Sequence, residues 1–97
     1  MEAEYQIIIH AVAAKEDWPR LPKAVQERVG KSIMSKLTTR PEVYGKPLRQ
    51  SLKNNYKLRV GDYRVVYRIK GKTVIIWAID HRAIIYAKAI KRLTAEF

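Results

Sequence analysis

The sequence lacks cysteine altogether, so disulfide bonds and thiolate metal sites are excluded. It also lacks any apolar run near the ~20 residues that a membrane-spanning helix requires. The opening residues, MEAEYQIII, have no basic segment ahead of a long apolar one, as a signal peptide would. Together these absences predict a protein of the reducing cytoplasm.

Several sequence motifs of enzymes are missing as well. There is no HExxH metal motif, no P-loop and no GxGxxG nucleotide motif. Only two histidines are present, His10 and His81, and they alone make no metal site. We therefore expect no metal and no cofactor. His10, at the end of a predicted strand, is expected to be structural.

Negative charge is scarce. The chain has 20 Lys and Arg but only 9 Asp and Glu, a formal net charge of +11. Residues 1–44 carry 7 basic and 6 acidic residues (+1), whereas residues 45–97 carry 13 and 3 (+10). Such asymmetry predicts a surface in the second half for nucleic acid, the ribosome or an acidic partner. The alternative is a solvated, solubilising surface.

An apolar fraction of 47% and the length of 97 residues predict one folded domain over residues 1–97. A first strand is expected over residues 4–10, buried on both faces because it contains the run Ile7 to Ile9. A short helix is expected over residues 11–17, and Pro19 should end it.

A longer helix is predicted from Leu21-Pro22 onward. Its apolar residues recur at every fourth position and should form one buried stripe: Leu21, Val25, Val29, Ile33 and Leu37, with Met34 beside them. The two helices would form a hairpin across one face of a sheet. Residues 38–47, with prolines at both 41 and 47, are expected to be a loop.

Three more strands are predicted after this loop. Residues 56–60 and 63–70 should form a hairpin with Gly61-Asp62 at its turn. Residues 73–79 (TVIIWAI) are apolar on both sides, so this strand should be central in the sheet. A closing helix is expected over residues 83–94. The predicted fold is α+β, with a mainly antiparallel four-stranded sheet, an N-terminal helical hairpin and a short C-terminal helix.

Basic and apolar residues alternate along the two strands of the hairpin. Lys57 and Arg59 occupy alternate positions of the first strand, and Arg64 and Arg68 occupy alternate positions of the second. Successive side chains of a strand point to opposite faces, so each strand should have an apolar and a cationic face. Such a sheet can pack on a core and offer its other face to a polyanion.

The start of the closing helix is a second candidate for the same site. If residues 82–94 are helical, Arg82 and Tyr86 lie one turn apart on one face and can converge with the hairpin on a phosphate. The alternative is that Tyr86 packs in the core and the arginines are only solvated.

These residues resemble the RelE/ParE superfamily of toxins from toxin–antitoxin systems. The resemblance rests on Leu48-Arg49, on the run YKLRVGDYRVVYRI from Tyr56 to Ile69, and on His81-Arg82 shortly before Tyr86, and it covers nearly the whole chain. The basic residues resemble the RelE branch, whose members are ribosome-dependent mRNA endonucleases, more than the gyrase-poisoning ParE branch.

The resemblance implies a set of site residues. In RelE-like toxins catalysis is attributed to two basic residues on one strand, an arginine on the next, and an arginine and a tyrosine near the C-terminus. These positions correspond here to Lys57, Arg59, Arg64, Arg82 and Tyr86. The residues expected to bind RNA are Lys46, Arg49, Lys53, Arg68 and His81.

The implied reaction is attack of an RNA 2′-hydroxyl on its own phosphate. The arginines suit stabilisation of the phosphorane charge. Lys57 is the first candidate for the base and His81 the second, while Tyr86 can stack on a nucleobase or assist proton transfer. No carboxylate–histidine pair of the usual ribonuclease sort is available, which predicts a weak enzyme in isolation that relies on the ribosome to hold mRNA.

Some positions depart from the family pattern. Asp80, Gln50 and Asn54 stand where glycines are common, and Arg59 replaces a lysine seen in some members. The identity of the proton acceptor therefore stays open. The alternatives for function are a gyrase inhibitor without nuclease activity and an inactive homologue. In either case the resemblance implies an acidic antitoxin partner that covers the basic face.

Overall fold

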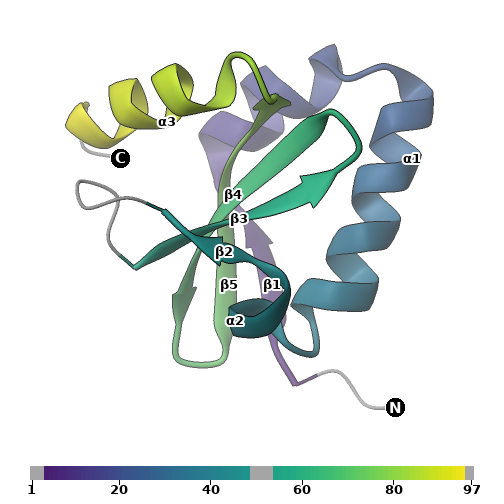
Figure 1. Ribbon diagram of the computed structural model, residues 1–97, viewed down its shortest axis with the longest axis vertical. Helices are drawn as coiled ribbons and strands as arrows, with labels where there is room; N and C mark the ends of the chain where they lie inside the picture. The colour runs from purple at the N-terminus through teal and green to yellow at the C-terminus, as the bar shows by residue number, and fades with distance from the viewer. Residues whose placement is uncertain (1–3, 49–53, 96–97) are drawn as a thin grey trace.

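The computed structural model describes residues 4–48 and 54–95, which form a five-stranded sheet with helices on both faces (Figure 1). The strand order is β1-β5-β4-β3-β2. The strands are β1 (Gln6–Ile9), β2 (Lys46–Pro47), β3 (Asn55–Val60), β4 (Tyr63–Lys70) and β5 (Thr73–His81). β1 pairs with β5 in parallel and the other pairs are antiparallel, so the predicted mainly antiparallel α+β fold is confirmed.

The helices follow the predicted order with two differences. They are η1 (Ala13–Asp17), η2 (Trp18–Arg20), α1 (Lys23–Ser32), η3 (Ile33–Leu37), α2 (Pro41–Tyr44) and α3 (Ile85–Thr94). The first helix ends at Asp17 as expected, but the 3₁₀ turn η2 follows it directly, with Pro19 at its start, where a missing N–H is tolerated. The expected loop over residues 38–47 instead contains α2 and the fifth strand, β2.

The first core lies between the N-terminal helices and one face of the sheet. Leu21, Val29, Ile33 and Leu37 are buried against residues of β3, β4 and β5, so the predicted stripe is largely confirmed. Met34 is 62% exposed, which corrects its assignment to the stripe. It follows Ile33 by one residue, a rotation of about 100° around the helix, and therefore turns to solvent.

The prediction that the first strand is buried on both faces is wrong. β1 pairs only with β5 and forms an edge of the sheet. Ile7 packs against the first core, but Ile8 is 49% and Ile9 40% exposed. An edge strand has a neighbour on one side only, so an apolar run does not by itself ensure burial.

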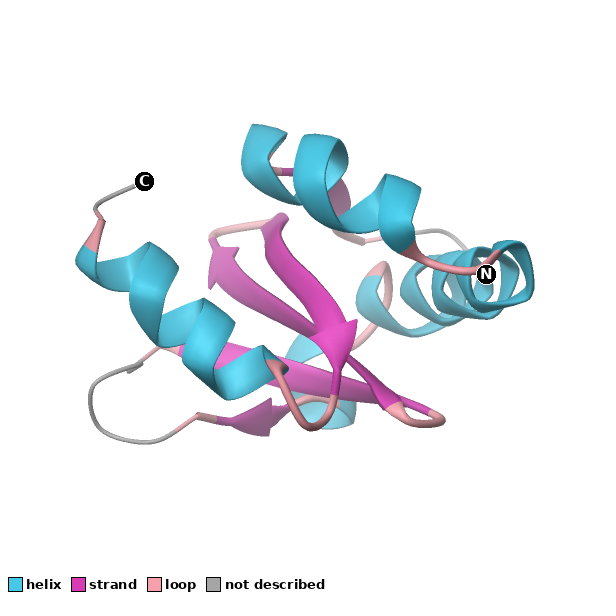
Figure 2. Cartoon of the chain, turned by 90° about the horizontal axis from the view of Figure 1, so that it is seen from above, coloured by secondary structure: helices cyan, strands magenta, loops and turns pink. Residues whose placement is uncertain are grey.

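A second, smaller core lies on the opposite face of the sheet, under α3. It consists of Val66, Trp77, Ala78, Ile85 and Ala89. Figure 2 shows the strands between α3 on one side and α1 on the other, which explains why β5 is apolar on both faces. The prediction that this strand is internal is confirmed, because β5 lies between β1 and β4.

None of the helices in the described part of the chain combines the length and the apolar character needed to cross a membrane.

Candidate functional site

A cationic hollow of about 180 Å³ lies on the β3–β4 hairpin, beside α2. It is lined by Tyr44, Lys46, Lys57, Arg59 and Arg64. We call this space, with the five residues that line it, the cationic hollow. The structure thus brings together three of the five predicted catalytic residues and one of the predicted RNA-binding residues.

Strand register explains this convergence. Arg59 and Arg64 lie directly opposite each other in the β3–β4 ladder, and Lys57 lies opposite Lys46 in the β2–β3 ladder. Since Lys57 and Arg59 are two residues apart, they point to the same face. The alternation in the sequence therefore predicted the shared face correctly.

Arg64 is oriented by the turn that precedes it. Its Nη1 donates hydrogen bonds to the carbonyl oxygens of Gly61 and Tyr63, both at 2.9 Å. Gly61 has φ +60°, a left-handed conformation that favours glycine. The turn therefore restrains one edge of the guanidinium against the backbone and leaves its other donors for a ligand.

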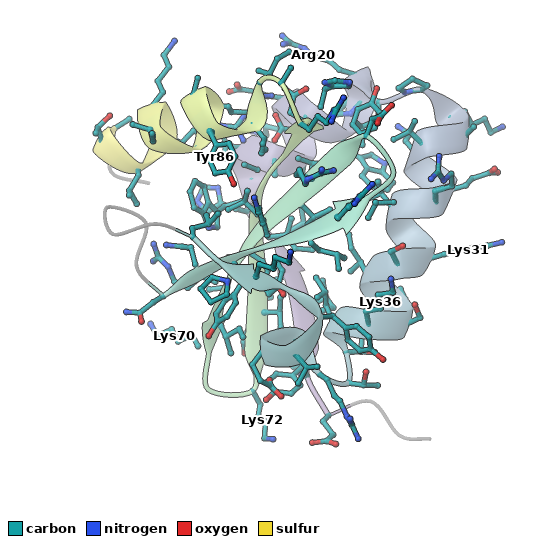
Figure 3. All side chains as sticks on the ribbon, in the orientation of Figure 1. Arg20, Lys31, Lys36, Lys70, Lys72 and Tyr86 are labelled. Carbon is teal, nitrogen blue, oxygen red and sulfur yellow. The ribbon has the colours of Figure 1, made fainter. Side chains whose placement is uncertain are left out.

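Tyr86 reaches the hollow through Lys57. The Lys57 ammonium donates a hydrogen bond to the Tyr86 hydroxyl, and its nitrogen lies 4.7 Å from the centre of that ring. Tyr86 is 40% exposed, so it does not pack in the second core. Figure 3 shows its side chain pointing from the first turn of α3 toward the sheet. The structure therefore brings Tyr86, a fourth predicted catalytic residue, into contact with Lys57.

The hollow contains no neutralising acid in the described part of the chain. No ion pair among residues 4–48 and 54–95 involves Lys46, Lys57, Arg59 or Arg64. Asp80 lies opposite Arg64 in the β4–β5 ladder, but its carboxylate pairs with Lys88 at 2.5 Å. Four cations on one small surface without paired carboxylates give this face a positive potential.

Arg82 lies outside the hollow, and the helical argument for it was wrong. α3 begins at Ile85, so Arg82 is in the preceding turn and not one helical turn before Tyr86. Its backbone N–H donates to the Asp62 carbonyl at 2.8 Å, and its Nε lies 4.0 Å from the Asp62 carboxylate. The side chain is 65% exposed, so it remains accessible from solvent.

Two predicted RNA-binding residues lie elsewhere. His81 Nδ1 accepts a hydrogen bond from the Ala83 N–H at 3.1 Å, and the imidazole packs edge-on against Tyr63, with ring centres 5.6 Å apart. Arg68 lines a separate hollow of about 530 Å³ together with Tyr56 and Lys70. Arg49 and Lys53 lie outside the described residues.

Sequence reasoning missed Tyr44. It ends α2, is 48% exposed and lines the hollow beside the predicted cations. The signal was present in the sequence, because an aromatic residue stands two positions before the basic Lys46. It carried little weight because the segment was expected to be an irregular loop.

Sequence reasoning also missed a buried ion-pair cluster that holds α3. Asp17 is 2% exposed and accepts hydrogen bonds from Lys88 Nζ at 2.9 Å and from both terminal nitrogens of Arg92 at 2.7 Å. The Ile79 N–H also donates to its carboxylate at 2.8 Å. We call Asp17, Lys88 and Arg92 the Asp17 clamp.

The clamp favours the charged forms of its members. Burial alone would raise the pKa of Asp17, but hydrogen bonds from Arg92, Lys88 and the Ile79 N–H outweigh it and lower the pKa. The hydrogen bond to Asp17 raises the pKa of Arg92 in spite of its partial burial. The clamp therefore fixes α3, which carries Tyr86, to η1 and β5.

In the described part of the chain, no group of three His, Asp or Glu side chains is arranged to hold a metal ion. The hollow and the adjoining Tyr86 present guanidinium groups, lysine side chains and phenol hydroxyls.

Comparisons with known proteins agree with this arrangement. Residues 8–86 match the family model described as the ParE toxin of the type II toxin–antitoxin system parDE. The chain belongs to the RelE/ParE superfamily of toxins. This toxin is 38% identical over 77 residues to toxin RelG of Mycobacterium tuberculosis, and the alignment covers 77% of this chain and 88% of RelG. It is 29% identical over 86 residues to the mRNA interferase toxin RelE of Escherichia coli, and that alignment covers 82% of this chain and 88% of RelE.

Solved structures of toxins share the fold. The toxin–antitoxin complex RelBE2 of Mycobacterium tuberculosis contains a chain with a TM-score of 0.76 and 33% identity, covering 86% of this toxin and 97% of that chain. A mutant of the E. coli toxin RelE in the free state gives a TM-score of 0.71 at 27% identity, covering 94% and 98%. The expected RelE-like fold is confirmed.

Proposed function

We propose that this toxin is an endoribonuclease that cleaves mRNA on the ribosome by attack of a ribose 2′-hydroxyl on the adjacent phosphate. The observation that carries the proposal is the cationic hollow. There Lys46, Arg59 and Arg64 lie beside the Lys57–Tyr86 pair, and no carboxylate in the described part of the chain pairs with these cations. The name of the E. coli relative, an mRNA interferase, supports the same reaction.

The five predicted catalytic residues each have a role in this reaction. The 2′-oxygen forms a bond to phosphorus while the bond from phosphorus to the 5′-oxygen breaks, leaving a 2′,3′-cyclic phosphate and a 5′-hydroxyl. Arg59 and Arg64 stabilise the charge on the phosphorane oxygens. Lys57 takes the 2′ proton as the general base, and Tyr86 lies in hydrogen-bond reach of Lys57 to relay a proton toward the 5′-oxygen. Arg82 joins from its exposed turn when RNA displaces Asp62.

The geometry also supports a need for the ribosome. The hollow is small, at about 180 Å³, and is lined by only five residues, so it can contact only a short part of an RNA strand. Positioning of the reacting groups supplies a large part of catalysis, and here the ribosome would provide it.

A cognate antitoxin is the second proposed partner. Structural neighbours of this chain include RelB–RelE toxin–antitoxin complexes, among them the intact E. coli complex at 28% identity. The unneutralised cations of the hollow would attract an acidic segment for the same reason that they attract RNA.

Induced expression in a bacterium without the antitoxin tests the proposal. We expect growth arrest, loss of translation and mRNA ends mapped by primer extension, with normal DNA supercoiling. Intact mRNA together with DNA breaks trapped on gyrase would instead show the ParE activity. Normal growth with folded protein would show an inactive homologue.

A further inference from the structure

One wall of the cationic hollow is aromatic and has no role in the proposed chemistry. Tyr44 lines the hollow together with Lys46, Arg59 and Arg64, and it is 48% exposed. We propose that Tyr44 is a stacking platform for a nucleobase next to the scissile phosphate. This inference rests on the proposed nuclease function and adds a base-binding subsite to it.

The backbone on both sides of Tyr44 is anchored to the sheet. Tyr67, which is fully buried in β4, donates a hydrogen bond from its hydroxyl to the Pro41 carbonyl at 2.5 Å. A side chain at Gly45 would overlap this Tyr67 hydroxyl, so only glycine lets the end of α2 approach so closely. Burial raises the pKa of Tyr67 and keeps its hydroxyl a donor. Tyr44, between these anchors, is therefore held at a fixed place beside the hollow.

A cation further fixes the ring of Tyr44. The Lys36 ammonium lies over one face of the ring, 5.7 Å from its centre. Lys36 belongs to η3, whereas the cations of the hollow come from β2, β3 and β4. This contact lies on one face of the ring, and at 48% exposure Tyr44 still offers surface on which a base can stack.

The neighbouring charges complete a nucleotide subsite. Proteins bind single-stranded RNA by stacking bases on aromatic side chains while basic side chains follow the phosphates. Here an exposed tyrosine and the cations Lys46, Arg59 and Arg64 line one hollow of about 180 Å³. A solvated basic surface would not require an aromatic ring anchored in this way.

Single-turnover cleavage of ribosome-bound mRNA tests the subsite. Base–aromatic stacking is worth ~1–3 kcal/mol, so Tyr44→Ala should lower the rate at subsaturating toxin about 5- to 150-fold, mainly through a higher half-saturating concentration. Tyr44→Phe keeps the stack and should stay within about threefold of wild type. Tyr44→Leu keeps an apolar side chain without a π face and should behave like Tyr44→Ala. Val43→Ala is the matched control, because Val43 is 63% exposed on the same helix and does not line the hollow.

A second readout separates this inference from the nuclease proposal. Quenching of 2-aminopurine in a short single-stranded RNA reports stacking without cleavage, and it should be lost in Tyr44→Ala and kept in Tyr44→Phe. Quenching that depends on Tyr44, without cleavage by wild type, would support the subsite and reject the nuclease. Cleavage and quenching unchanged in Tyr44→Ala would overturn the subsite and leave the nuclease standing. Equal losses in Tyr44→Phe and Tyr44→Ala would overturn stacking as well.

Discussion

The same kinds of basic side chain meet two different environments in this molecule. In the Asp17 clamp, Lys88 and Arg92 close on a buried carboxylate at 2.9 and 2.7 Å. In the cationic hollow, Lys57, Arg59 and Arg64 face solvent, with no carboxylate paired to them in the described part of the chain. The first arrangement pairs its cations with carboxylates, whereas the second leaves its cations without an acidic partner among the described residues.

Net charge alone therefore does not locate a site. Both clusters belong mainly to the basic second half of the sequence, although Asp17 and Tyr44 come from the first. The position of the acids distinguishes the two clusters, because Asp17 and Asp80 pair with the cations of the clamp, whereas no acid of the described residues pairs with those of the hollow. The clamp also serves the hollow indirectly, since it holds the helix that carries Tyr86.

The largest effect is expected from breaking the clamp. Asp17→Ala leaves Lys88 and Arg92 without their buried partner and should lower the free energy of unfolding by about 3–5 kcal/mol. Urea denaturation measures the change. Glu16→Ala is the control, because Glu16 is 61% exposed and contacts Arg92 only at 3.6 Å, so its loss should cost less than about 1 kcal/mol. Equal effects of the two substitutions would show that the clamp has no special role.

Removing one cation from the hollow should reduce activity strongly and stability only slightly, the reverse of what is expected for the clamp. Arg64→Ala should slow cleavage of ribosome-bound mRNA about 10²–10³-fold, as loss of one pre-positioned donor does. Unfolding should change by only about 1 kcal/mol, since the side chain makes two hydrogen bonds to the backbone. Lys31→Ala, an exposed lysine of α1 that points away from the hollow (Figure 3), should leave the rate unchanged. Full activity in Arg64→Ala would remove it from the site.

The clamp should also make stability depend on pH in the acid range. The pKa of Asp17 lies below its ordinary value of 3.8, so the folded state binds this proton less readily than the unfolded state. Its contribution to stability is present above about pH 4 and is lost as the pH falls through the folded-state pKa. Thermal melts between pH 6 and pH 2 should show a steeper acid loss in wild type than in Asp17→Asn. Parallel curves would contradict the linkage.

The smallest effect of a single substitution is expected on the salt dependence of RNA affinity. If about four or five cations each meet a phosphate, the log–log slope of RNA affinity against salt should be roughly −3 to −4. Lys57→Ala should reduce that slope by about 0.7, and Lys31→Ala should leave it unchanged. Titrations of single-stranded RNA at several salt concentrations measure both. A slope near zero would show that the hollow is only a solvated surface.

The hollow is easier to predict from the sequence than the clamp, for a physical reason. Alternation along a strand fixes which side chains share a face, so Lys57, Arg59 and Arg64 can be grouped without coordinates. Asp17 is 71 residues from Lys88 and 75 from Arg92, and no local pattern links such distant positions. From the sequence alone, Lys88 and Arg92 are only favourable charges near a helix end.

Local patterns are also insufficient at the edges of the sheet. The run Ile7 to Ile9 is as apolar as a buried strand, but burial depends on how many neighbours a strand has. Tyr44 was missed because its segment was expected to be a loop, and the Tyr67–Pro41 hydrogen bond that joins α2 to β4 links residues 26 positions apart. The roles of the individual site residues stay predictions.

Cleavage of an mRNA with a single 2′-deoxy nucleotide at the scissile position is the most direct test of the central claim. Wild-type toxin and ribosomes would be mixed with this mRNA and with its all-ribose counterpart, and the product ends would be identified by mass spectrometry. We expect the ribose mRNA to yield a 2′,3′-cyclic phosphate and a 5′-hydroxyl, and the deoxy mRNA to remain intact at that position. Cleavage of the deoxy mRNA at the same bond would contradict the proposed mechanism, because the nucleophile would then not be the ribose hydroxyl.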